Sequence, residues 1–310
     1  MGLQHKVGLP RNREDWSALG YLAGWKCLRW LPAPLARALF NAIADYACDY
    51  GRGMEQLRRN LMRVVGPENV TRQLVRDSMR SYMRYWLEAF RLPDMHQDPQ
   101  LQQQLVDSIE GKHYLDESIK AGRGVILALP HSGNWDMAGV CLVSLQGQFT
   151  TVAERVRPEV LFQAFVDFRT KLGFDVIPLS GGEVSPFARL KEVVEQGGFA
   201  VLLAERDLSG SGIEVEFFED TASVASGPAR LAYETGAPLH VVHTWFKPDD
   251  TDGTQRWGLS VSAPLKAGDV QGYAQQMADG FAENIAKHPA DWHMLQPLFN
   301  ADIRRRRKGQ

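Results

Sequence analysis

The stretch GVILALPHSGNWDMAG, residues 124–139, places a histidine and an aspartate where they can move a proton. The apolar run 124–129 leads into a proline, His131 follows at once, and Asp136 comes five residues later. A neutral imidazole accepts a hydroxyl proton, while a neighbouring carboxylate fixes its tautomer and stabilises the imidazolium that forms. We therefore predict that His131 is a general base and that an acidic side chain orients it.

Helix geometry restricts how Asp136 can contribute. On a continuous helix, residues five apart point about 140° away from each other, because each residue turns about 100°. If residues 132–134 form a turn and a helix begins near Trp135, His131 precedes that helix and Asp136 occupies its first turn. A carboxylate there suits the helix dipole. From that position Asp136 is expected to reach the second ring nitrogen of His131.

A second acidic residue follows another apolar run. The run FAVLLA, residues 199–204, ends at Glu205, just as the run 124–129 ends near His131. Because reactive groups gather at the carboxyl ends of parallel strands, Glu205 and His131 share one rim if their strands are neighbours. Two candidate orienting carboxylates, Asp136 and Glu205, therefore remain open.

Other reactive arrangements are less well supported. Ser132 lacks the G-x-S-x-G context of a hydrolase nucleophile. His240 and His243 would face opposite sides of a strand, and no metal-binding spacing is present, so we expect no metal and no cofactor. The segment SGGEV, residues 180–184, is either a plain turn, which we favour, or a phosphate-binding turn.

Composition narrows the class of protein. The chain has 310 residues, 44% of them hydrophobic and 23% charged, with a net charge of -2. That charge argues against general nucleic-acid binding. The cysteines form no C-x-x-C pair, which fits a reducing compartment: Cys27, Cys48 and Cys141. We see neither a secretory signal nor a run apolar enough for a membrane span, so we expect a cytosolic protein that can lie on a membrane surface.

The N-terminal region, residues 16–91, reads as helical. Pro32 and Pro34 are expected to separate two helices. The first, at 16–31, is rich in tryptophan and either lies along a bilayer interface or packs on the core. Two further helices, within 53–91, carry arginines that form either a solvated face or a face toward lipid headgroups: Arg58, Arg59, Arg63, Arg72, Arg76, Arg80, Arg84 and Arg91.

The rest of the chain alternates short apolar runs with helix-like stretches, which predicts an α/β fold with a central, mostly parallel sheet flanked by helices. Strands are expected at 124–129, 149–153, 174–178 and 199–204, and runs at 213–218, 238–246 and 257–262 are expected to extend the sheet. A helix is expected near 269–287. We predict a single domain, 1–310, with membrane-facing helices at about 16–91, a catalytic core at about 110–300 and a basic tail at 301–310.

Several blocks of the sequence resemble one known family. The segment HSGNWD resembles the H-x4-D/E block of the lysophospholipid acyltransferase superfamily, and residues 124–139 resemble the bacterial lipid A lauroyl/myristoyl acyltransferases. Further blocks follow in the same order, so the resemblance covers about residues 50–300: 154–178, 202–220, 226–238 and DWHM at 291–294. Within the family, the chain is most similar to the branch that acylates mannosylated phosphatidylinositols.

The resemblance implies roles for particular residues. His131 matches the family's base, Asp136 the acid of H-x4-D, and Glu205 the acid that pairs with the histidine. Arg169 matches an arginine of the active site, and Glu154 a polar residue of the same pocket. Two more residues of the matching blocks are expected to bind substrate: Asn134 and Asp207. Lipid A enzymes usually carry glutamate at position 136, and their F-F-G segment is Phe217-Phe218-Glu219 here, which questions any backbone role of that glycine.

The activity implied by the resemblance is transfer of a palmitoyl group from palmitoyl-CoA to a mannose 6-hydroxyl of phosphatidylinositol mannosides. The partners would be acyl-CoA as co-substrate, a mannosylated phosphatidylinositol acceptor and an anionic membrane surface. The enzyme would be peripheral, on the cytoplasmic face of the plasma membrane. A helix at 135–147 either lines a groove for the acyl chain or packs as ordinary core, and amides near 131–135 or Arg169 are expected to stabilise the oxyanion.

Three alternatives remain open from the sequence. In the first, the acceptor is a different, lipid A-like glycolipid. In the second, the same histidine and acid activate water, as in a thioesterase or lipid hydrolase. In the third, the chain is a non-catalytic lipid carrier. The tail RRRRK, residues 304–308, either contacts an anionic leaflet or is a solvated end.

Overall fold

The computed structural model describes residues 28, 30–182, 184–248 and 256–308, with the side chains of 305–308 outside that description. The Trp-rich segment predicted at 16–31 therefore lies almost wholly outside the described residues. Of the helices that the structure does describe, none combines the length and the apolar composition needed to cross a bilayer.

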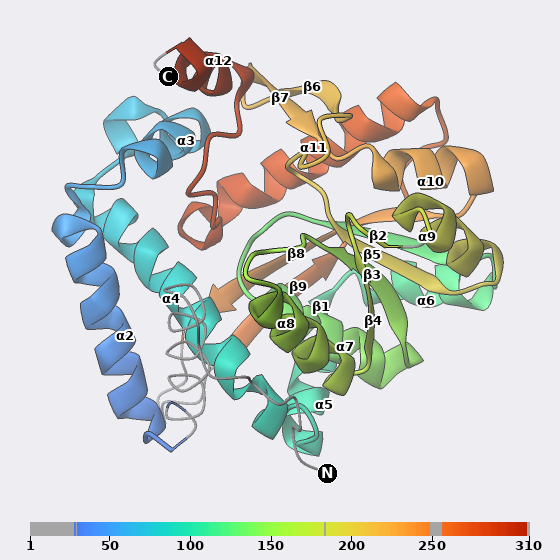
Figure 1. The fold of residues 1–310 in the computed structure, drawn as a ribbon, viewed down its shortest axis with the longest axis horizontal. Helices are drawn as coiled ribbons and strands as arrows, with labels where there is room; N and C mark the ends of the chain where they lie inside the picture. The colour runs from blue at the N-terminus through green and yellow to red at the C-terminus, as the bar shows by residue number, and fades with distance from the viewer. Residues whose placement is uncertain (1–27, 29, 183, 249–255, 309–310) are drawn as a thin grey trace.

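A seven-stranded sheet forms the centre of the protein (Figure 1), in the spatial order β1-β9-β8-β2-β5-β3-β4. Strands β8, β2, β5, β3 and β4 are parallel to one another, and only the β8–β9 pairing is antiparallel, which confirms the predicted mostly parallel sheet. The strands are β1 (Ile109–Glu110), β2 (Val125–Leu129), β3 (Phe149–Ala153), β4 (Phe174–Pro178), β5 (Phe199–Leu203), β8 (Leu239–Lys247) and β9 (Arg256–Val261).

One strand prediction is wrong. The run at 213–218 does not extend the central sheet, because β6 (Ile213–Phe217) pairs only with β7 (Asp220–Val224) in a separate antiparallel hairpin. Its residues alternate between exposed Glu214 and Glu216 and buried Val215 and Phe217. That one-sided pattern is typical of an antiparallel ribbon lying on a core, whereas a central parallel strand is buried on both faces.

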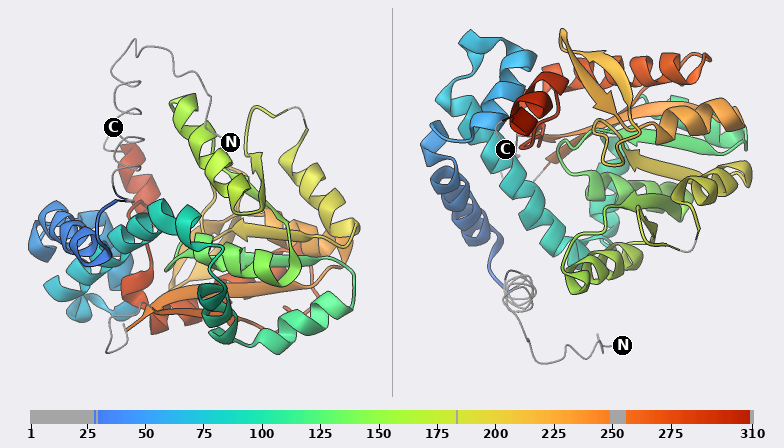
Figure 2. Two further views of the ribbon diagram at one scale, coloured as in Figure 1. Left: turned by 90° about the horizontal axis from the view of Figure 1, so that it is seen from below. Right: turned by 45° about the horizontal axis from the view of Figure 1, so that its top comes forward.

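Helices cover both faces of the sheet (Figures 1 and 2). One face packs against α5 (Pro99–Asp107), α6 (Lys112–Lys120), α7 (Trp135–Gln146) and α8 (Glu159–Lys171). The other face packs against α9 (Pro186–Glu195), α10 (Gly227–Thr235) and α11 (Val270–Lys287). The fully buried β2, of sequence VILAL, lies between these two layers, so the residue that follows it reaches the rim from a rigid position.

The N-terminal helices stand beside the sheet rather than over it, as both views in Figure 2 show. Helix α2 (Ala33–Ala47) begins directly after Pro32, as the prolines predicted, and it packs on α4 (Arg72–Met95). Helix α3 (Glu55–Val65) completes a small apolar core with them. The chain ends with α12 (Asn300–Lys308), so the predicted tail continues as a helix through Lys308.

The arginines of this region form ion pairs within the protein. Arg76 and Arg80 both bind the carboxylate of Asp45, and Arg63 bridges Asp220 and Asp302. Neither sequence alternative, a solvated face or a lipid-facing one, describes these three side chains. They fasten α2 to α4, and α3 to the hairpin and to α12.

Candidate active site

The predicted rim is formed because β2 and β5 are neighbours. They pair in parallel, and Leu129 lies opposite Leu203. His131 and Glu205, each two residues past its strand, therefore reach the same edge. The alternation of side chains along a strand does not by itself fix this contact, so the tertiary pairing of β2 with β5 decides it.

The imidazole of His131 is held by Glu205. Its Nδ1 lies 2.8 Å and 3.0 Å from the two carboxylate oxygens, and the backbone N–H of His131 donates to Oε1 at 2.8 Å. Glu205 is fully buried, whereas the His131 side chain is 32% exposed. Because Nδ1 carries the proton that faces the carboxylate, Nε2 keeps a lone pair, which is the state a general base requires.

The loop that carries His131 is clamped from two sides. The His293 amide donates to the carbonyl of His131 at 2.8 Å, the Gly133 amide donates to the carbonyl of Asp291 at 2.9 Å, and the Thr244 hydroxyl donates to the carbonyl of Ser132. Gly133 has φ +52°, and a Cβ there would lie 2.6 Å from the Thr244 backbone. Only glycine fits so close to β8 in this conformation.

Asp136 has different partners from those expected. It lies in the first turn of α7 as predicted, but its carboxylate accepts from Arg169 Nε at 2.8 Å, from Arg169 Nη2 at 3.3 Å and from Tyr85 Oη at 2.9 Å. Of the two candidate acids, Glu205 is therefore the one that binds the ring of His131.

The partners of Asp136 have shifted pKa values. Burial, and then the negative charge of Asp136, raise the pKa of Tyr85. Burial by itself would lower the pKa of Arg169, but the negative charge of Asp136 more than offsets this effect, so the pKa of Arg169 is raised.

The structure also places the other residues predicted to bind substrate: Asn134, Asp207 and Glu154. Asn134 caps α7, accepting from the amide of Met137, and its amide group donates to Glu88 at 2.7 Å. The Asp207 carboxylate accepts from groups of its own loop, including the amide of Gly212. Glu154 follows β3 at the same rim of the sheet and is exposed.

Helix α4 supplies residues that the sequence reasoning missed. Ser81, Tyr85 and Glu88 are spaced i, i+4 and i+7, which places them on one face of the helix. Each is buried and bonds to the site, through His293, Asp136 and Asn134 respectively. The sequence signal that could have identified these three residues is their polar character on a helix face that is otherwise apolar and buried.

His293, in the DWHM block, was also missed as an individual residue. Ser81 Oγ lies 2.6 Å from Asp291 Oδ1 and 2.9 Å from His293 Nε2. Because the hydroxyl hydrogen goes to the carboxylate, Nε2 donates to Ser81, and Nδ1 is left as an acceptor. Burial, and then the nearby His131, lower the pKa of His293 to about 3, so this ring is neutral.

A narrow apolar slot includes Trp135, which packs against His131, in its lining. It lies between α7 and the sheet, has a free volume of about 30 Å³, and is lined at one end by Trp135, whose ring packs edge-on against His131 with 5.3 Å between centroids. From Trp135 to Leu145 it follows about 15 Å of helix. The remaining lining is aliphatic or Cys141, including Ala138, Leu129 and Val242.

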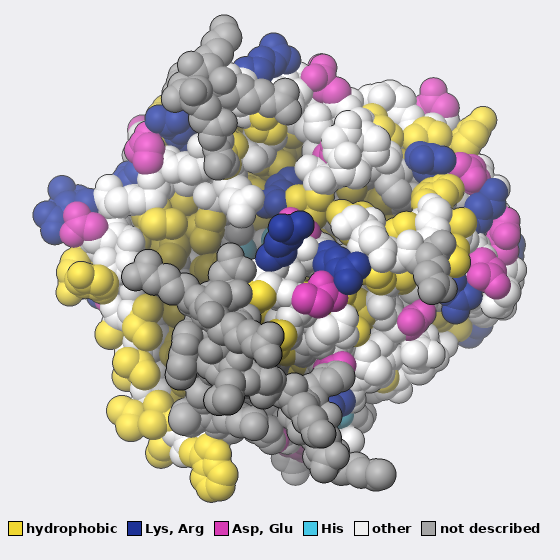
Figure 3. Space-filling view, viewed as in Figure 1, with side chains coloured by type: hydrophobic (Ala, Val, Ile, Leu, Met, Phe, Trp, Pro, Cys, Tyr) yellow, Lys and Arg dark blue, Asp and Glu magenta, His cyan; other side chains and the backbone are white. Residues whose placement is uncertain are grey.

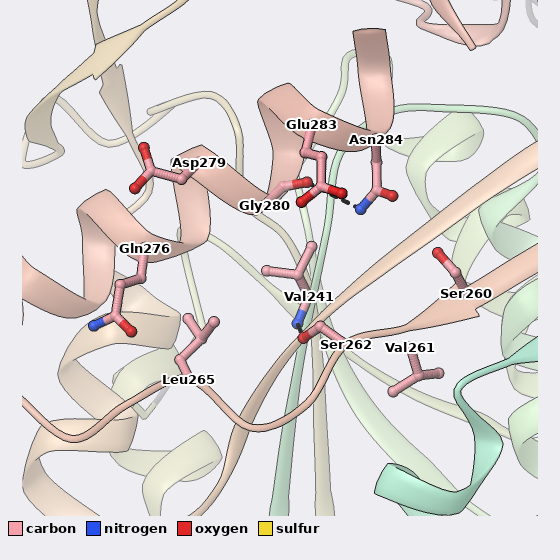
Figure 4. A pocket seen from close by; sticks show the side chains of 10 residues that line it. All are labelled: Val241, Ser260, Val261, Ser262, Leu265, Gln276, Asp279, Gly280, Glu283 and Asn284. Atoms are coloured by element: carbon pink, nitrogen blue, oxygen red, sulfur yellow. Dashed lines mark hydrogen bonds between the residues drawn. The ribbon is translucent and has the colours of Figure 1, made fainter. Parts of the chain in front are cut away.

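A second hollow, of about 430 Å³, lies on the other face of the sheet (Figure 4). Six of its ten lining residues are polar, with α11 facing the β8–β9 pair: Gln276, Asp279, Glu283, Asn284, Ser260 and Ser262. It shares no residue with the His131 cluster.

Within the described part of the chain, no group of three or more histidine, cysteine, aspartate or glutamate side chains is placed to hold a metal ion. What the rim offers is a histidine with a free nitrogen, a buried acid behind it and an apolar slot beside it. This arrangement can take a proton from a hydroxyl group and present that oxygen to an acyl carbonyl.

Comparison with known proteins gives consistent matches. The family described as bacterial lipid A biosynthesis acyltransferase matches residues 5–301. A protein of Mycolicibacterium smegmatis named phosphatidylinositol mannoside acyltransferase is 51% identical over 314 aligned residues, covering 100% of this chain and 99% of that protein. Proteins of the same name from two Mycobacterium tuberculosis strains are 48% identical, covering 98% of this chain and 94% of theirs.

Proposed function

The chain belongs to the bacterial lipid A biosynthesis acyltransferase family and is an acyltransferase, and from this premise we propose that it moves a palmitoyl group from palmitoyl-CoA to a mannose 6-hydroxyl of a mannosylated phosphatidylinositol. The relatives' name supports the acceptor class. The observation that carries the mechanism is the contact between His131 Nδ1 and the buried carboxylate of Glu205.

In this mechanism, Nε2 of His131 removes the hydroxyl proton as the oxygen attacks the thioester carbonyl. Glu205 stabilises the imidazolium, because an ionised carboxylate buried beside a cation interacts with it more strongly than it would in water. No step needs a metal ion or a bound cofactor. Asp136 holds Arg169 at the rim, which supports a role for that pair in binding the polar part of a substrate.

The apolar slot supports a long-chain donor. Each buried methylene contributes about 0.8 kcal/mol, so a slot that runs the length of α7 favours a long acyl chain over a short one. The slot is narrow, so an acyl chain has to move its lining side chains apart. The alternative that α7 is only core packing predicts no dependence on chain length.

An exposed apolar stripe on α2 supports work at a lipid surface (Figure 3). Leu35, Leu39, Ile43 and Tyr46 are 43% to 81% exposed and lie within an arc of about 80°. The opposite face of α2 is fixed to α4 through Asp45. We propose that this stripe docks on the cytoplasmic leaflet as a peripheral contact; the buried free thiols of Cys48 and Cys141 fit that reducing compartment.

The decisive experiment compares wild type with His131→Ala, using palmitoyl-CoA and mono- or dimannosylated phosphatidylinositol. We expect at least a 1,000-fold loss of acylated product with an unchanged unfolding temperature. Retained activity in this variant would remove the base assignment. Thioester hydrolysis that is as fast without the acceptor as with it would favour the hydrolase, and palmitate binding without turnover in the wild type would favour the carrier.

The slot and the stripe are tested separately. Ala138→Trp, which fills the slot, is expected to abolish palmitoyl transfer and to spare transfer from a short-chain acyl-CoA.

The apolar stripe on α2 is tested by the double substitution Leu39→Asn with Ile43→Asn, which is expected to reduce flotation of the protein with anionic phosphatidylinositol vesicles. Tyr233→Asn, an equally exposed apolar residue on α10, is the matched control and should float like the wild type.

A further inference from the structure

Acyl transfer creates a negative charge on the former carbonyl oxygen, and hydrogen-bond donors must be aimed at it. Three expected donors are already used. The amide of His131 donates to Glu205 at 2.8 Å, that of Ser132 to Pro130 at 2.8 Å and that of Gly133 to Asp291 at 2.9 Å. The first three of the five predicted amides, 131–135, are therefore not free to bind an oxyanion.

Arg169, the other predicted stabiliser, is oriented toward Asp136 by two of its five N–H donors. Its Nε and Nη2 hold both oxygens of Asp136, whose side chain is 3% exposed. Turning the guanidinium toward an oxyanion would leave this buried carboxylate with Tyr85 as its remaining partner. Breaking a buried pair in that way leaves an uncompensated charge in the interior, which would cancel the benefit.

Trp135 presents a donor that the protein itself does not use. Its indole Nε1 is buried and has no hydrogen-bond partner among the described residues. The ring lines the slot, packs edge-on against His131 at 5.3 Å and stacks on Tyr85 at 3.8 Å between centroids. A buried N–H without a partner destabilises the fold, so its presence in a ring packed against His131 calls for a partner that arrives with the substrate.

We propose that the Trp135 indole N–H is the oxyanion donor of this acyltransferase, an inference that rests on the proposed function. The ring borders the slot and also packs against His131. Entry of the acyl chain, which must widen the slot, brings the thioester oxygen to the indole nitrogen. Trp135 is then a catalytic residue, and one side chain both guides the hydrocarbon and stabilises the charge.

The step balances as follows. His131 Nε2 takes the hydroxyl proton, the acceptor oxygen bonds to the carbonyl carbon, and the carbonyl π pair moves onto the oxygen, where the Trp135 N–H holds it. The pair then returns to reform the carbonyl and the C–S bond breaks. The CoA thiolate leaves and takes the proton from the His131 imidazolium.

The test is Trp135→Phe, which keeps an aromatic ring in the slot and removes the N–H. We expect kcat to fall about 100- to 1,000-fold while KM for palmitoyl-CoA changes less than threefold. Trp245→Phe is the matched control, because Trp245 is a buried tryptophan stacked on His288, outside the site, and its replacement should leave kcat unchanged. A kcat within threefold of wild type, or a rise in KM alone, overturns the proposal.

A second substitution covers the case in which phenylalanine disturbs the fold. Benzothienylalanine at position 135 keeps the indole shape and replaces N–H by sulfur, so the same loss of kcat is expected with an unchanged unfolding temperature. In the His131→Ala background, the carbonyl stretch of bound ¹³C-labelled palmitoyl-CoA should move to higher frequency when the N–H is removed, and an unmoved band contradicts the contact.

The two proposals fail differently. If His131→Ala keeps its activity, the proposed mechanism fails. If His131→Ala is inactive while Trp135→Phe turns over at the wild-type rate, the base assignment stands and only the role of Trp135 is lost.

Discussion

Two buried carboxylates organise two regions of this molecule, and they do so in opposite ways. Asp45, between α2 and α4, accepts four hydrogen bonds of 2.5–2.8 Å from Arg76 and Arg80. Glu205, at the rim, meets the backbone N–H and the imidazole of His131. The arginines stay charged at any working pH, whereas an imidazole can lose and regain a proton. The first region therefore holds the fold, and the second leaves a reactive nitrogen.

The largest effect is expected for Glu205→Gln, which removes the charge of the carboxylate at the rim. An amide no longer fixes the tautomer of His131 or stabilises its cation, so we expect kcat to fall roughly 1,000- to 10,000-fold. Steady-state transfer from palmitoyl-CoA measures this, with circular dichroism to show that the fold remains. A loss of less than tenfold would mean that Glu205 only holds the loop.

Gly133→Ala should reduce both the stability of the protein and its activity. The added Cβ meets the Thr244 backbone at 2.6 Å in a left-handed conformation, so the loop must shift. We expect about 2–4 kcal/mol less stability and about a 100-fold lower kcat, since small misplacements of a catalytic group are costly. Chemical denaturation and kinetics check the two effects. Gly210→Ala, where a Cβ meets open space, is the control for the cost of a positive φ alone.

Asp45→Asn tests whether the carboxylate between α2 and α4 stabilises the fold without affecting activity. We expect about 2–3 kcal/mol less stability, because two partly exposed arginines lose their charged partner, and unchanged kcat in detergent-solubilised substrate. Equal stability of variant and wild type would show that the pair is dispensable.

The pH dependence of the same pair has a definite sign. Hydrogen bonds from Arg76 and then Arg80 hold the pKa of Asp45 well below its ordinary value. The stabilisation is therefore complete above the unfolded-state pKa of about 3.9 and is lost as the pH falls below it. Urea titrations between pH 6 and 3 should show a shallower decline for Asp45→Asn than for the wild type.

The smallest effect is expected outside both regions, at the β6–β7 turn. Phe218 and Glu219 have φ of +51° and +60°. Because a side chain is strained there, Glu219→Gly should stabilise the protein by about 1 kcal/mol and leave kcat unchanged. A destabilised variant would mean that the Glu219 side chain makes a contribution larger than the strain.

Sequence patterns predicted the layers of the fold and the residues of the site better than the contacts between those residues. The rim position of His131 and Glu205 follows from strand ends, and the place of Asp136 in the first turn of α7 follows from helix geometry. The partners of Asp136 do not, because Arg169 and Tyr85 come from helices remote in the chain. The run at 213–218 failed for a related reason: apolar content marks a strand but not the sheet that it joins.

What the sequence alone determined is local: where the buried strands end, which residues stand at those ends, and the family blocks they belong to. These depend on periodicity and on neighbours a few residues away. Only the tertiary structure decided that Glu205 rather than Asp136 holds the imidazole, that the amides of 131–133 are already used, and that the indole N–H of Trp135 has no partner among the described residues. The contacts of Glu205 and Asp136 join segments more than 30 residues apart, which no local pattern encodes.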